Sequence, residues 1–388
     1  MTDSAPPLGV YVHWPYCARI CPYCDFNVVR ERGRTAEKAA LGAAILADLA
    51  AQRALTGPRR LVSVFLGGGT PSLMDPALAG EVIATARRLW SPDADLEVTL
   101  EANPTDAEAE RFAAFRDAGV NRLSLGLQSL RDEALAALGR NHDAATAIRA
   151  ARRAAAIFPR LSLDLIYARP GQTPADWAQE LAAAIDLGAE HVSPYQLTIE
   201  AGTAFDRAVG RGTLVPPDPD TAAALYETTQ AGLEAAGFEA YEVSNHARGE
   251  AARSRHNLVY WRGWDYVGAG PGAHGRLTLG GARHATAAPR AIADYGAAIA
   301  AGTGPERERL DPREQALERL LMGLRTVEGV ALAELAPLDI PPARLADLAG
   351  LGLVRLQGDP LDGGRLIATP SGRPVLDRLT AEIAGVGV

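Results

Sequence analysis

The chain has 388 residues, 47% of them hydrophobic, and its 39 Lys and Arg residues against 47 Asp and Glu residues give a net charge of −8. This length is enough for one large domain with its own core and a second, smaller domain. This net negative charge is not that of a protein that binds a nucleic acid or an anionic membrane through a basic surface, and it argues against both partners. The N-terminus lacks a basic region followed by an apolar run, and no apolar stretch is long enough to span a bilayer, so we expect a soluble cytoplasmic protein.

All three cysteines lie in one short stretch, directly after an apolar strand that we expect at 10–13. Cys17, Cys21 and Cys24 have the spacing C-x3-C-x2-C, which allows three thiols to face one point. Thiolates select zinc, copper(I) or iron–sulfur clusters. Iron–sulfur chemistry is favoured, because a four-iron cluster held by three cysteines keeps one iron open for chemistry. A structural zinc site completed by His13 and unpaired core thiols stay as alternatives, although no second Cys/His pair follows at zinc-site spacing.

Strand and helix patterns alternate from the cysteine segment to residue 197. The predicted strands are 10–13, 61–66, 96–100, 122–125, 161–166 and 191–197. The predicted helices between them are 35–55, 76–89, 106–118, 131–138, 144–158 and 174–187. This alternation implies right-handed βαβ crossovers and a parallel sheet. Six units are too few for a closed eight-stranded barrel, so we predict an α/β fold with a partial (βα)6 TIM-type barrel.

Polar or glycine residues follow the predicted strands at their carboxyl ends, where parallel βα folds carry their working residues. They are Cys17, residues 67–70, Glu101, Asn103, Gln128, Asp164, Tyr195 and Thr198. The segment 67–70 (GGGT) lacks the Lys of a P-loop and the spacing of a dinucleotide fingerprint, so it could be a plain tight turn. Consecutive glycines also permit a close backbone approach to a ligand. Both interpretations are open from the residues alone.

The regular alternation of strand and helix patterns ends after residue 197. A Gly- and Pro-rich connection at 198–220 leads into a predicted helix at 221–236 and a short strand at 237–245. The segment RHNLVYW at 255–261 and the WDY that follows it place four aromatic residues close together. They could seal the open edge of the barrel or form a site for a large flat ligand.

The C-terminal section combines helices with one small hairpin. We predict helices at 289–301 and 312–324 and a Gly-turned hairpin with strands at 353–356 and 365–368. This pattern indicates a mostly helical, winged-helix-like domain. Arg residues here mix with Asp and Glu and form no basic stripe, so a docking or lid role is favoured over nucleic-acid binding. The predicted division is therefore a barrel core at 1–200, a barrel-edge extension at 201–300 and a C-terminal domain at 301–388.

The segment YVHWPYCARICPYCDFN at 11–27 resembles the signature of the radical S-adenosylmethionine (SAM) family, in its coproporphyrinogen oxidase-related branch. The resemblance spans nearly the whole chain. It implies that Cys17, Cys21 and Cys24 hold a 4Fe-4S cluster and that the amino and carboxylate groups of SAM bind the fourth iron. It also implies a partial-barrel core and a docking role for the C-terminal domain.

Further positions match SAM contacts of that family. By this resemblance they are Tyr11, Tyr23, Gly68, Gly69, Thr70, Glu101, Gln128, Arg140, Asp164 and Thr198. The side-chain chemistry of two of them fits a role in SAM binding. The Arg140 guanidinium can bind a carboxylate with two hydrogen bonds, and the Asp164 carboxylate can accept hydrogen bonds from ribose hydroxyls. Taken alone, each of Gln128, Arg140 and Asp164 would more often be a surface salt-bridge partner.

RHNLVYW matches the His-Asn-x-x-Tyr-Trp motif of the heme-chaperone group within this branch, whose members bind and transfer heme. The resemblance implies heme and heme-acceptor proteins, including respiratory ones, as partners. The heme candidates are His256, Asn257, Tyr260 and Trp261, with His246, His274 and His13 behind His256. No C-x-x-C-H motif is present, so we do not expect thioether attachment of that type.

Two differences separate this chain from the oxygen-independent coproporphyrinogen III oxidase of the same branch. The oxidase has a further cysteine two positions after the triad, where this chain has Phe26, and residues 1–9 are too short for its N-terminal substrate region. We therefore expect a heme chaperone without coproporphyrinogen decarboxylation. The alternative is that oxidase or another SAM-radical enzyme acting on a tetrapyrrole. SAM cleavage, enzymatic activity, a homodimer and peripheral membrane association stay open.

Overall fold

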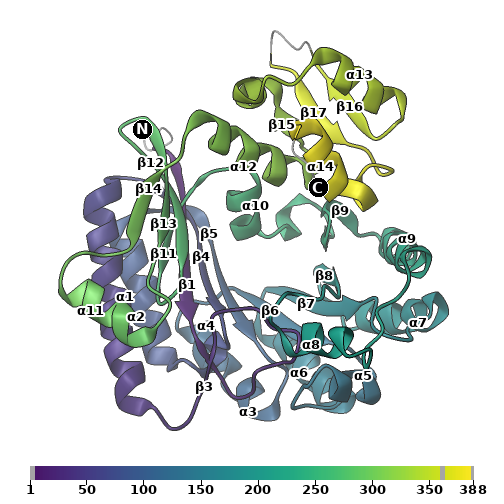
Figure 1. The fold of residues 1–388 in the computed structure, drawn as a ribbon. Helices are drawn as coiled ribbons and strands as arrows, with labels where there is room; N and C mark the ends of the chain where they lie inside the picture. The colour runs from purple at the N-terminus through teal and green to yellow at the C-terminus, as the bar shows by residue number, and fades with distance from the viewer. Residues whose placement is uncertain (1–4, 359–362, 386–388) are drawn as a thin grey trace.

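Six parallel strands form the centre of a twelve-stranded sheet in the computed structural model, which describes residues 5–358 and 363–385 (Figure 1). In spatial and chain order they are β1 (Pro7–Trp14), β4 (Arg60–Gly68), β5 (Ser91–Ala102), β6 (Arg122–Gln128), β7 (Arg160–Tyr167) and β8 (His191–Gln196). Each pairs in parallel with the next. Within the described ranges no pairing joins the two edge strands of the sheet. The predicted α/β fold with six βα units in a partial barrel is confirmed.

Helices on the outer face of the sheet make the crossovers. They are α1 (Thr35–Thr56), α2 (Pro76–Leu89), α3 (Asp106–Ala109), α4 (Phe112–Asp117), α5 (Asp132–Ala137), α6 (Ala144–Ile157) and α7 (Pro174–Ile185). Short polar side chains begin several of them: the Asp75, Asp143 and Thr173 side chains each accept a hydrogen bond from a first-turn N–H. Such caps satisfy backbone donors that have no partner inside the helix.

The helix predicted at 106–118 is divided into α3 and α4. Glu108, in α3 just before the break, is buried and its carboxylate accepts from the backbone N–H of Asn103 at 2.9 Å and from the Ser72 hydroxyl. A buried carboxylate needs such donors, so this side chain is held at the carboxyl end of β5. The interruption therefore lies next to the edge of the sheet that carries the candidate site.

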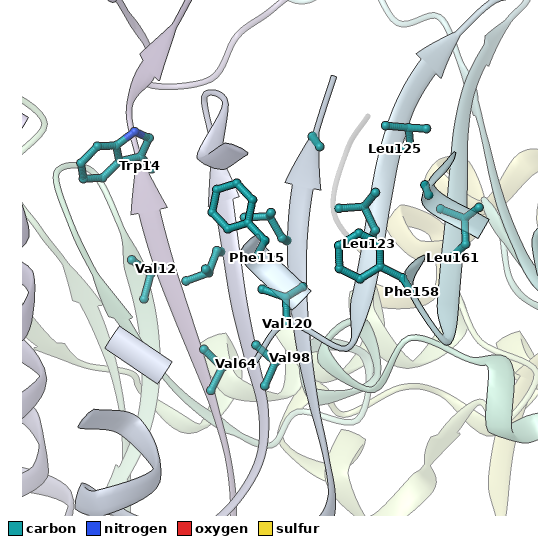
Figure 2. Packing of buried hydrophobic residues seen from close by; sticks show 14 of the residues in the cluster. Val12, Trp14, Val64, Val98, Phe115, Val120, Leu123, Leu125, Phe158 and Leu161 are labelled. Carbon is teal, nitrogen blue, oxygen red and sulfur yellow. The ribbon is translucent and has the colours of Figure 1, made fainter. Parts of the chain in front are cut away.

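The main core lies between the sheet and the outer helices. Figure 2 shows Val12, Val64 and Val98 on three neighbouring strands, and Phe115 of α4 belongs to the same buried cluster. Phe158 packs edge-on against Phe112 at a centroid distance of 5.9 Å. Alternate strand residues point to opposite faces, so this apolar face leaves the other face of the same strands free to line the barrel interior.

The sheet continues past the six parallel strands on both sides. Beyond β1 lie β11 (Asp265–Ala269), β12 (His274–Leu279), β13 (Ala282–Ala287) and β14 (Glu306–Arg309), and beyond β8 lie β10 (Asn245–Ala247) and β9 (Glu239–Glu242). The strand predicted at 237–245 is thus a hairpin. The Glu242 carboxylate accepts from the Ser244 N–H at 2.7 Å, which closes the turn.

Several short elements complete the core region. They are β2 (Tyr16–Cys17), β3 (Val29–Arg30), η1 (Pro71–Leu73), α8 (Ala204–Gly210), α9 (Pro219–Ala235), η2 (Glu250–Ala252), α10 (Arg255–Trp261) and α11 (Ile292–Ala300). The RHNLVYW segment forms α10, which packs against β4 and β1. The helix predicted at 289–301 begins later, because the Pro289 carbonyl accepts from the Gly272 N–H at 2.9 Å and the Arg290 carbonyl from Asn27 at 2.9 Å.

The C-terminal section has its own hydrophobic cluster. Its elements are α12 (Pro312–Leu324), β15 (Val330–Ala331), η3 (Leu332–Leu338), α13 (Pro342–Gly350), β16 (Val354–Gln357), β17 (Arg365–Ala368), η4 (Arg373–Val375) and α14 (Leu376–Ala384). The predicted hairpin is present, with β15 added as a third strand; part of its Gly-rich turn, 359–362, lies outside the described residues. Leu320, Leu366 and Ile383 are fully buried between these elements.

Ion pairs join this section to the core. Arg262, directly after α10, pairs with Glu328 at 2.6 Å, and Arg276 of β12 pairs with Glu318 of α12 at 2.6 Å. Figure 1 shows α12 next to α10 and the edge strands. Among the helices of the described ranges, none has the length and apolar character needed to cross a membrane.

Candidate functional site

A cavity of about 480 Å³ opens at the carboxyl ends of the parallel strands and contains all three cysteines. The same cavity is lined by every predicted SAM contact except Tyr11: these are Tyr23, Gly68, Gly69, Thr70, Glu101, Gln128, Arg140, Asp164 and Thr198. Residues separated by up to 181 positions, from Cys17 to Thr198, are therefore brought together. This is the edge at which the sequence pattern placed the working residues.

The cysteine loop is held by backbone and side-chain hydrogen bonds. Cys17 is buried in the short parallel pair β2–β3, and the Cys24 N–H donates to the Cys21 carbonyl at 3.2 Å. The Thr70 hydroxyl donates to the Cys17 sulfur at 3.5 Å, and the Arg140 guanidinium donates to the Cys21 sulfur at 3.3 Å. None of the three cysteines forms a disulfide.

The thiolate forms of Cys17 and Cys24 are disfavoured without an added cation. Burial, with smaller contributions from the other two thiols, raises the pKa of Cys17 to about 11. Burial likewise raises the pKa of Cys24. A bound metal reverses this preference, because a cationic centre stabilises the thiolate ligands that coordinate it. The donor set therefore fits a metal cluster.

The three cysteines share one cavity, yet within the described ranges no group of three or more His, Cys, Asp or Glu side chains is arranged to hold a single metal ion. The zinc alternative would need His13 to complete the ligand set of the three cysteines. His13 is engaged elsewhere, through Nδ1 with the Tyr11 hydroxyl at 2.9 Å and through Nε2 with the Asn27 carbonyl at 2.8 Å. In a four-iron cluster each thiolate binds a different iron, so the sulfurs need not converge on one atom.

The glycine turn at the end of β4 packs directly on the chain that leads to the cysteines. The Gly69 N–H donates to the Trp14 carbonyl at 2.8 Å, and a Cβ on Gly69 would lie 2.8 Å from the backbone of Pro15 and Tyr16. A Cβ on Gly68, whose φ is +110°, would lie 2.6 Å from the His13 ring. A side chain at either position would collide with the chain that leads to the cysteines, so both positions need glycine with or without a bound ligand.

Two carboxylates, Glu101 and Asp164, face the cavity. Burial is the larger cause, and the charge of Asp164 the smaller one, that raises the pKa of Glu101 to about 8. A hydrogen bond from the Gly68 N–H, at 3.0 Å, acts in the opposite direction and lowers this pKa. Removal from water also raises the pKa of Asp164, whose carboxylate accepts from the Ser124 hydroxyl at 2.8 Å. A cationic ligand between them would favour their ionised forms. The sulfonium and amino groups of SAM supply such charge.

Arg140 lies at the opposite side of the site, beside the cysteines. Its guanidinium also donates to the Tyr23 hydroxyl at 3.4 Å and to Asn103 at 2.5 Å, while its Nε is buried with no partner within the described residues. Gln128, at the end of β6, adopts a left-handed φ of +64°. A non-glycine residue in this region is strained and often marks a ligand site.

A second cavity of about 630 Å³ adjoins the first and extends into the barrel interior. The two cavities share Phe26, Gly68, Glu101, Asp164 and Tyr195. The second contains Tyr11 and three of the four heme candidates, His256, Asn257 and Tyr260. Its volume falls within the range of about 300–1,000 Å³ typical of small-molecule sites.

The fourth candidate, Trp261, lines neither cavity. Its ring packs with Tyr241 and Leu258, and the Arg325 guanidinium lies 4.8 Å from its ring centroid. Trp261 therefore faces the C-terminal section. Within α10, the motif presents His256 and Tyr260 to the interior and Trp261 to that section.

His256 is buried with both ring nitrogens in use. Nδ1 lies 2.8 Å from the Ser63 hydroxyl and Nε2 lies 2.7 Å from the Tyr260 hydroxyl, and the ring stacks on Phe65. Burial lowers the pKa of His256 to about 3. Iron coordination by this imidazole would require one of these hydrogen bonds to break.

The other histidine candidates differ in access. His246 is buried between β8 and β9, with Nε2 bonded to Gln230 at 3.1 Å, and lines neither cavity. His13 lines the second cavity with both nitrogens bonded. His274 lines the same cavity, and its side chain is exposed.

Polar residues that face the barrel interior were missed by the sequence reasoning. Ser124 holds Asp164, Ser162 bonds His191 at 2.7 Å, and Glu97 is buried against Arg160 at 2.6 Å. The strand sequences did contain a signal for these interior residues. RLSLGLQ and RLSLDLIY alternate polar or small residues with apolar ones. The apolar set fills the outer core and the other set lines the interior.

Comparisons with known proteins agree with this arrangement. Residues 11–184 match the model of the Radical SAM superfamily, and residues 310–375 match the HemN C-terminal domain. A heme chaperone HemW from Mycobacterium tuberculosis is 38% identical, over 98% of this chain and 95% of the relative. A heme chaperone HemW from Bacillus subtilis is 35% identical, over 89% of this chain and 92% of the relative.

A mitochondrial protein of Bos taurus, radical S-adenosyl methionine domain-containing protein 1, is 42% identical over 85% of this chain and 71% of the relative. Among solved structures, the coproporphyrinogen III oxidase HemN from Escherichia coli, described as a radical SAM enzyme, superposes with a TM-score of 0.79 at 21% identity. That superposition covers 98% of this chain and 90% of HemN. At this identity the likeness concerns the fold.

Proposed function

The chain belongs to the radical SAM superfamily and, within it, to the group that contains the heme chaperone HemW, and from this premise we propose that it binds heme and delivers it to acceptor proteins. The observation that carries the proposal is the second cavity, with Tyr11, Tyr260, Tyr266 and His274 in its wall. Heme is flat, apolar and iron-bearing, so it suits a site of aromatic side chains and imidazole.

Cys17, Cys21 and Cys24 are the proposed ligands of a 4Fe-4S cluster. Support comes from their shared cavity, from the raised pKa values of Cys17 and Cys24, and from the absence of disulfides. When bound, the cluster with SAM supplies one-electron chemistry, while the protein supplies position and protection from water.

The residues around this centre have separate proposed roles toward SAM. Glu101 and Asp164 would balance the positive charge of the ligand, because both carboxylates lie in the cavity wall. Arg140 would pair with the SAM carboxylate through its guanidinium. Tyr11, Tyr23, Gly68, Gly69, Thr70, Gln128 and Thr198 are the remaining proposed contacts. Tyr11 lines only the second cavity, and its hydroxyl is bonded to His13.

Three further expectations accompany the proposal. We expect a reducing, cytoplasmic location, because free thiols beside one another persist in reduced compartments. Respiratory and other heme proteins are the expected acceptors, and a homodimer and peripheral membrane association are retained as predictions. The division at residues 200 and 300 is also a prediction; β14, at Glu306–Arg309, still pairs with β13 beyond the second boundary.

Heme titration and anaerobic turnover on one preparation test the function. The reconstituted protein should bind heme and should leave coproporphyrinogen III unchanged in the presence of SAM and a reductant. Conversion of coproporphyrinogen III to protoporphyrinogen IX would overturn the chaperone proposal in favour of the alternative, an oxidase. Absence of both activities would reject both functions.

A further inference from the structure

Iron ligation inside the second cavity requires an accessible donor atom. The chain has seven histidines, all within the described residues. Ring nitrogens of six of them make hydrogen bonds: His13, His142, His191, His246, His256 and His284. His274, at the start of β12, lines the cavity and makes no such bond to any described residue. Its imidazole is therefore available to a ligand.

Tyrosines are the other potential iron ligands in this cavity. The Tyr11 hydroxyl is bonded to His13 and the Tyr260 hydroxyl to His256. Burial raises the pKa values of all four tyrosines of the cavity, Tyr11, Tyr195, Tyr260 and Tyr266, above the usual value for tyrosine, so their phenolate forms are scarce at neutral pH. Iron binds a tyrosine as the phenolate. A neutral imidazole needs no such deprotonation at neutral pH.

A free cation lies at the same cavity. Arg290 is exposed, lines the cavity, and its guanidinium forms no ion pair with any described residue. An arginine fork binds carboxylates with two parallel hydrogen bonds. Heme carries two propionates in addition to its iron, so an imidazole and an arginine form a complementary pair for this ligand.

The backbone places these two residues beside each other and fixes them to the cysteine loop. In the β12–β13 ladder His274 is opposite Ala287, and the Ala288 N–H donates to the Ala273 carbonyl at 2.9 Å. The Asn27 side-chain amide donates to both the Pro271 and the Arg290 carbonyls at 2.9 Å. Asn27 follows Cys24 by three residues, so one loop ties the cysteine cavity to the His274–Arg290 segment.

We propose that His274 supplies the axial imidazole to the heme iron and that Arg290 binds a heme propionate. His256 then acts as a positioning residue that holds Tyr260 in the cavity wall. This inference rests on the proposed heme-binding function and assigns its contacts to residues outside the RHNLVYW motif.

Heme titration of four variants tests the assignment. His274→Ala should weaken heme binding by at least about 10-fold, since loss of only an outer-shell partner of a metal ligand costs about 10- to 100-fold. It should also remove the spectroscopic signature of an axial imidazole, and added free imidazole should restore that signature. His284→Ala, on the neighbouring strand and outside the cavity, is the matched control and should keep the wild-type spectrum and affinity.

The arginine is tested in the same titration. Arg290→Ala should weaken heme binding with the axial-imidazole signature retained, because the iron ligand is untouched. Arg307→Ala, an exposed arginine on β14 outside the cavity, is its control. Circular dichroism and thermal unfolding establish that each variant is folded, which we expect because His274 and Arg290 are exposed side chains.

The outcomes separate this inference from the function on which it rests. Failure of the wild-type protein to bind heme rejects the proposed function itself. Wild-type binding with an imidazole signature that persists in folded His274→Ala rejects the assignment of His274 and leaves the chaperone proposal standing. Unchanged affinity in Arg290→Ala rejects the propionate contact alone.

Discussion

The imidazole Nε2 of His256 lies 2.7 Å from the hydroxyl of Tyr260, one turn further along α10. The motif histidine and tyrosine are thus bonded to each other, and the ring of Tyr260 meets Tyr266 edge-on at 4.6 Å. This relationship fixes His256 and Tyr260 to each other in the wall of the second cavity.

Tyr260→Phe should remove that hydrogen bond while keeping the ring. We expect destabilisation of about 0.5–1.5 kcal/mol, the usual net value of a protein hydrogen bond. Heme should still bind with the axial-imidazole signature, since the proposed ligand is His274. Urea unfolding and heme titration measure the two effects, and loss of the imidazole signature in a folded variant would speak for iron ligation through the motif.

The triple variant Cys17→Ala, Cys21→Ala, Cys24→Ala should lose the cluster. After anaerobic reconstitution, wild-type protein should hold about four irons and four sulfides per chain, because the three thiolates bind one cubane. Iron and sulfide analysis with electron paramagnetic resonance of the reduced protein checks this. Stable stoichiometric zinc in the wild-type protein, with no sulfide, is the opposing result.

Glu101 should make SAM binding depend on pH. Its pKa of about 8 means that most of the carboxyl is protonated at neutral pH in the ligand-free protein. A cationic ligand favours the ionised form, so affinity for SAM should rise as pH increases through about 8. Calorimetric titration at several pH values should show this rise in wild type and a smaller rise in Glu101→Gln, which retains Asp164 and should bind more weakly at high pH. A flat wild-type profile is the contrary outcome.

The Glu101 carboxyl also makes the stability of the ligand-free protein depend on pH, with a trend opposite to that of the affinity for SAM. The pKa of Glu101 in the folded state is above the ordinary glutamate value of 4.5, so between about 4.5 and 8 the folded state binds more protons than the unfolded state. Stability of the ligand-free protein should therefore fall as pH rises through this window. Glu101→Gln should raise the melting temperature at pH 8.5 and have little effect near pH 4.5. The gain is on the order of 1–2 kcal/mol after allowance for partial exposure to the cavity.

Gly69→Ala should disturb the seat of the cysteine loop. The added Cβ would lie 2.8 Å from the backbone of Pro15 and Tyr16, which cannot yield as a flexible side chain could. We expect about 1–3 kcal/mol of destabilisation, as for overpacking, and reduced cluster loading. Gly296→Ala is the control, because its Cβ in α11 meets nothing within 4 Å and should stabilise the helix by about 0.5–1 kcal/mol. Equal unfolding curves for the two variants would contradict the close packing.

Glu97→Gln should displace α10. The Glu97 carboxylate is buried, pairs with Arg160 at 2.6 Å, and accepts from the N–H groups of Arg255 and His256 at 3.1 and 3.0 Å. Arg160 keeps its pair with Glu190 at 2.9 Å, but the buried Arg122, 4.0 Å from Glu97, loses the one carboxylate with which it pairs within the described residues. Leaving that buried charge uncompensated should cost about 3–5 kcal/mol. Asp95→Asn is the control, since its exposed pair with Arg255 should contribute only about 0–1 kcal/mol. Chemical denaturation compares them, and a similar small loss in both variants would refute the role of Glu97.

Local sequence patterns were sufficient for the cysteine loop and the six parallel strands. The spacing of Cys17, Cys21 and Cys24 is visible within eight residues, and each strand is a short apolar or alternating run bounded by turn residues. The collection of Glu101, Gln128 and Asp164 in one cavity follows from the rule that working residues lie at the carboxyl ends of parallel strands. Arg140, in the connection between α5 and α6, was indicated only by the family resemblance.

Long-range packing could not be predicted in this way. The partner of His256 is Ser63, 193 residues earlier, and no local signal indicates that pairing. The motif made His256 the first heme candidate. In the structure both of its ring nitrogens are hydrogen-bonded to neighbouring side chains. Access to His274 likewise depends on the turn held by Asn27, which is contributed by a distant part of the chain.

Heme titration of the wild-type protein, followed by its Soret absorbance, tests the central claim most directly. The cavity beside the cysteines predicts a saturable transition at one heme per chain, with a spectrum distinct from that of free heme. Absorbance that increases linearly without saturation and keeps the spectrum of free heme would contradict the assignment of this chain as a heme chaperone.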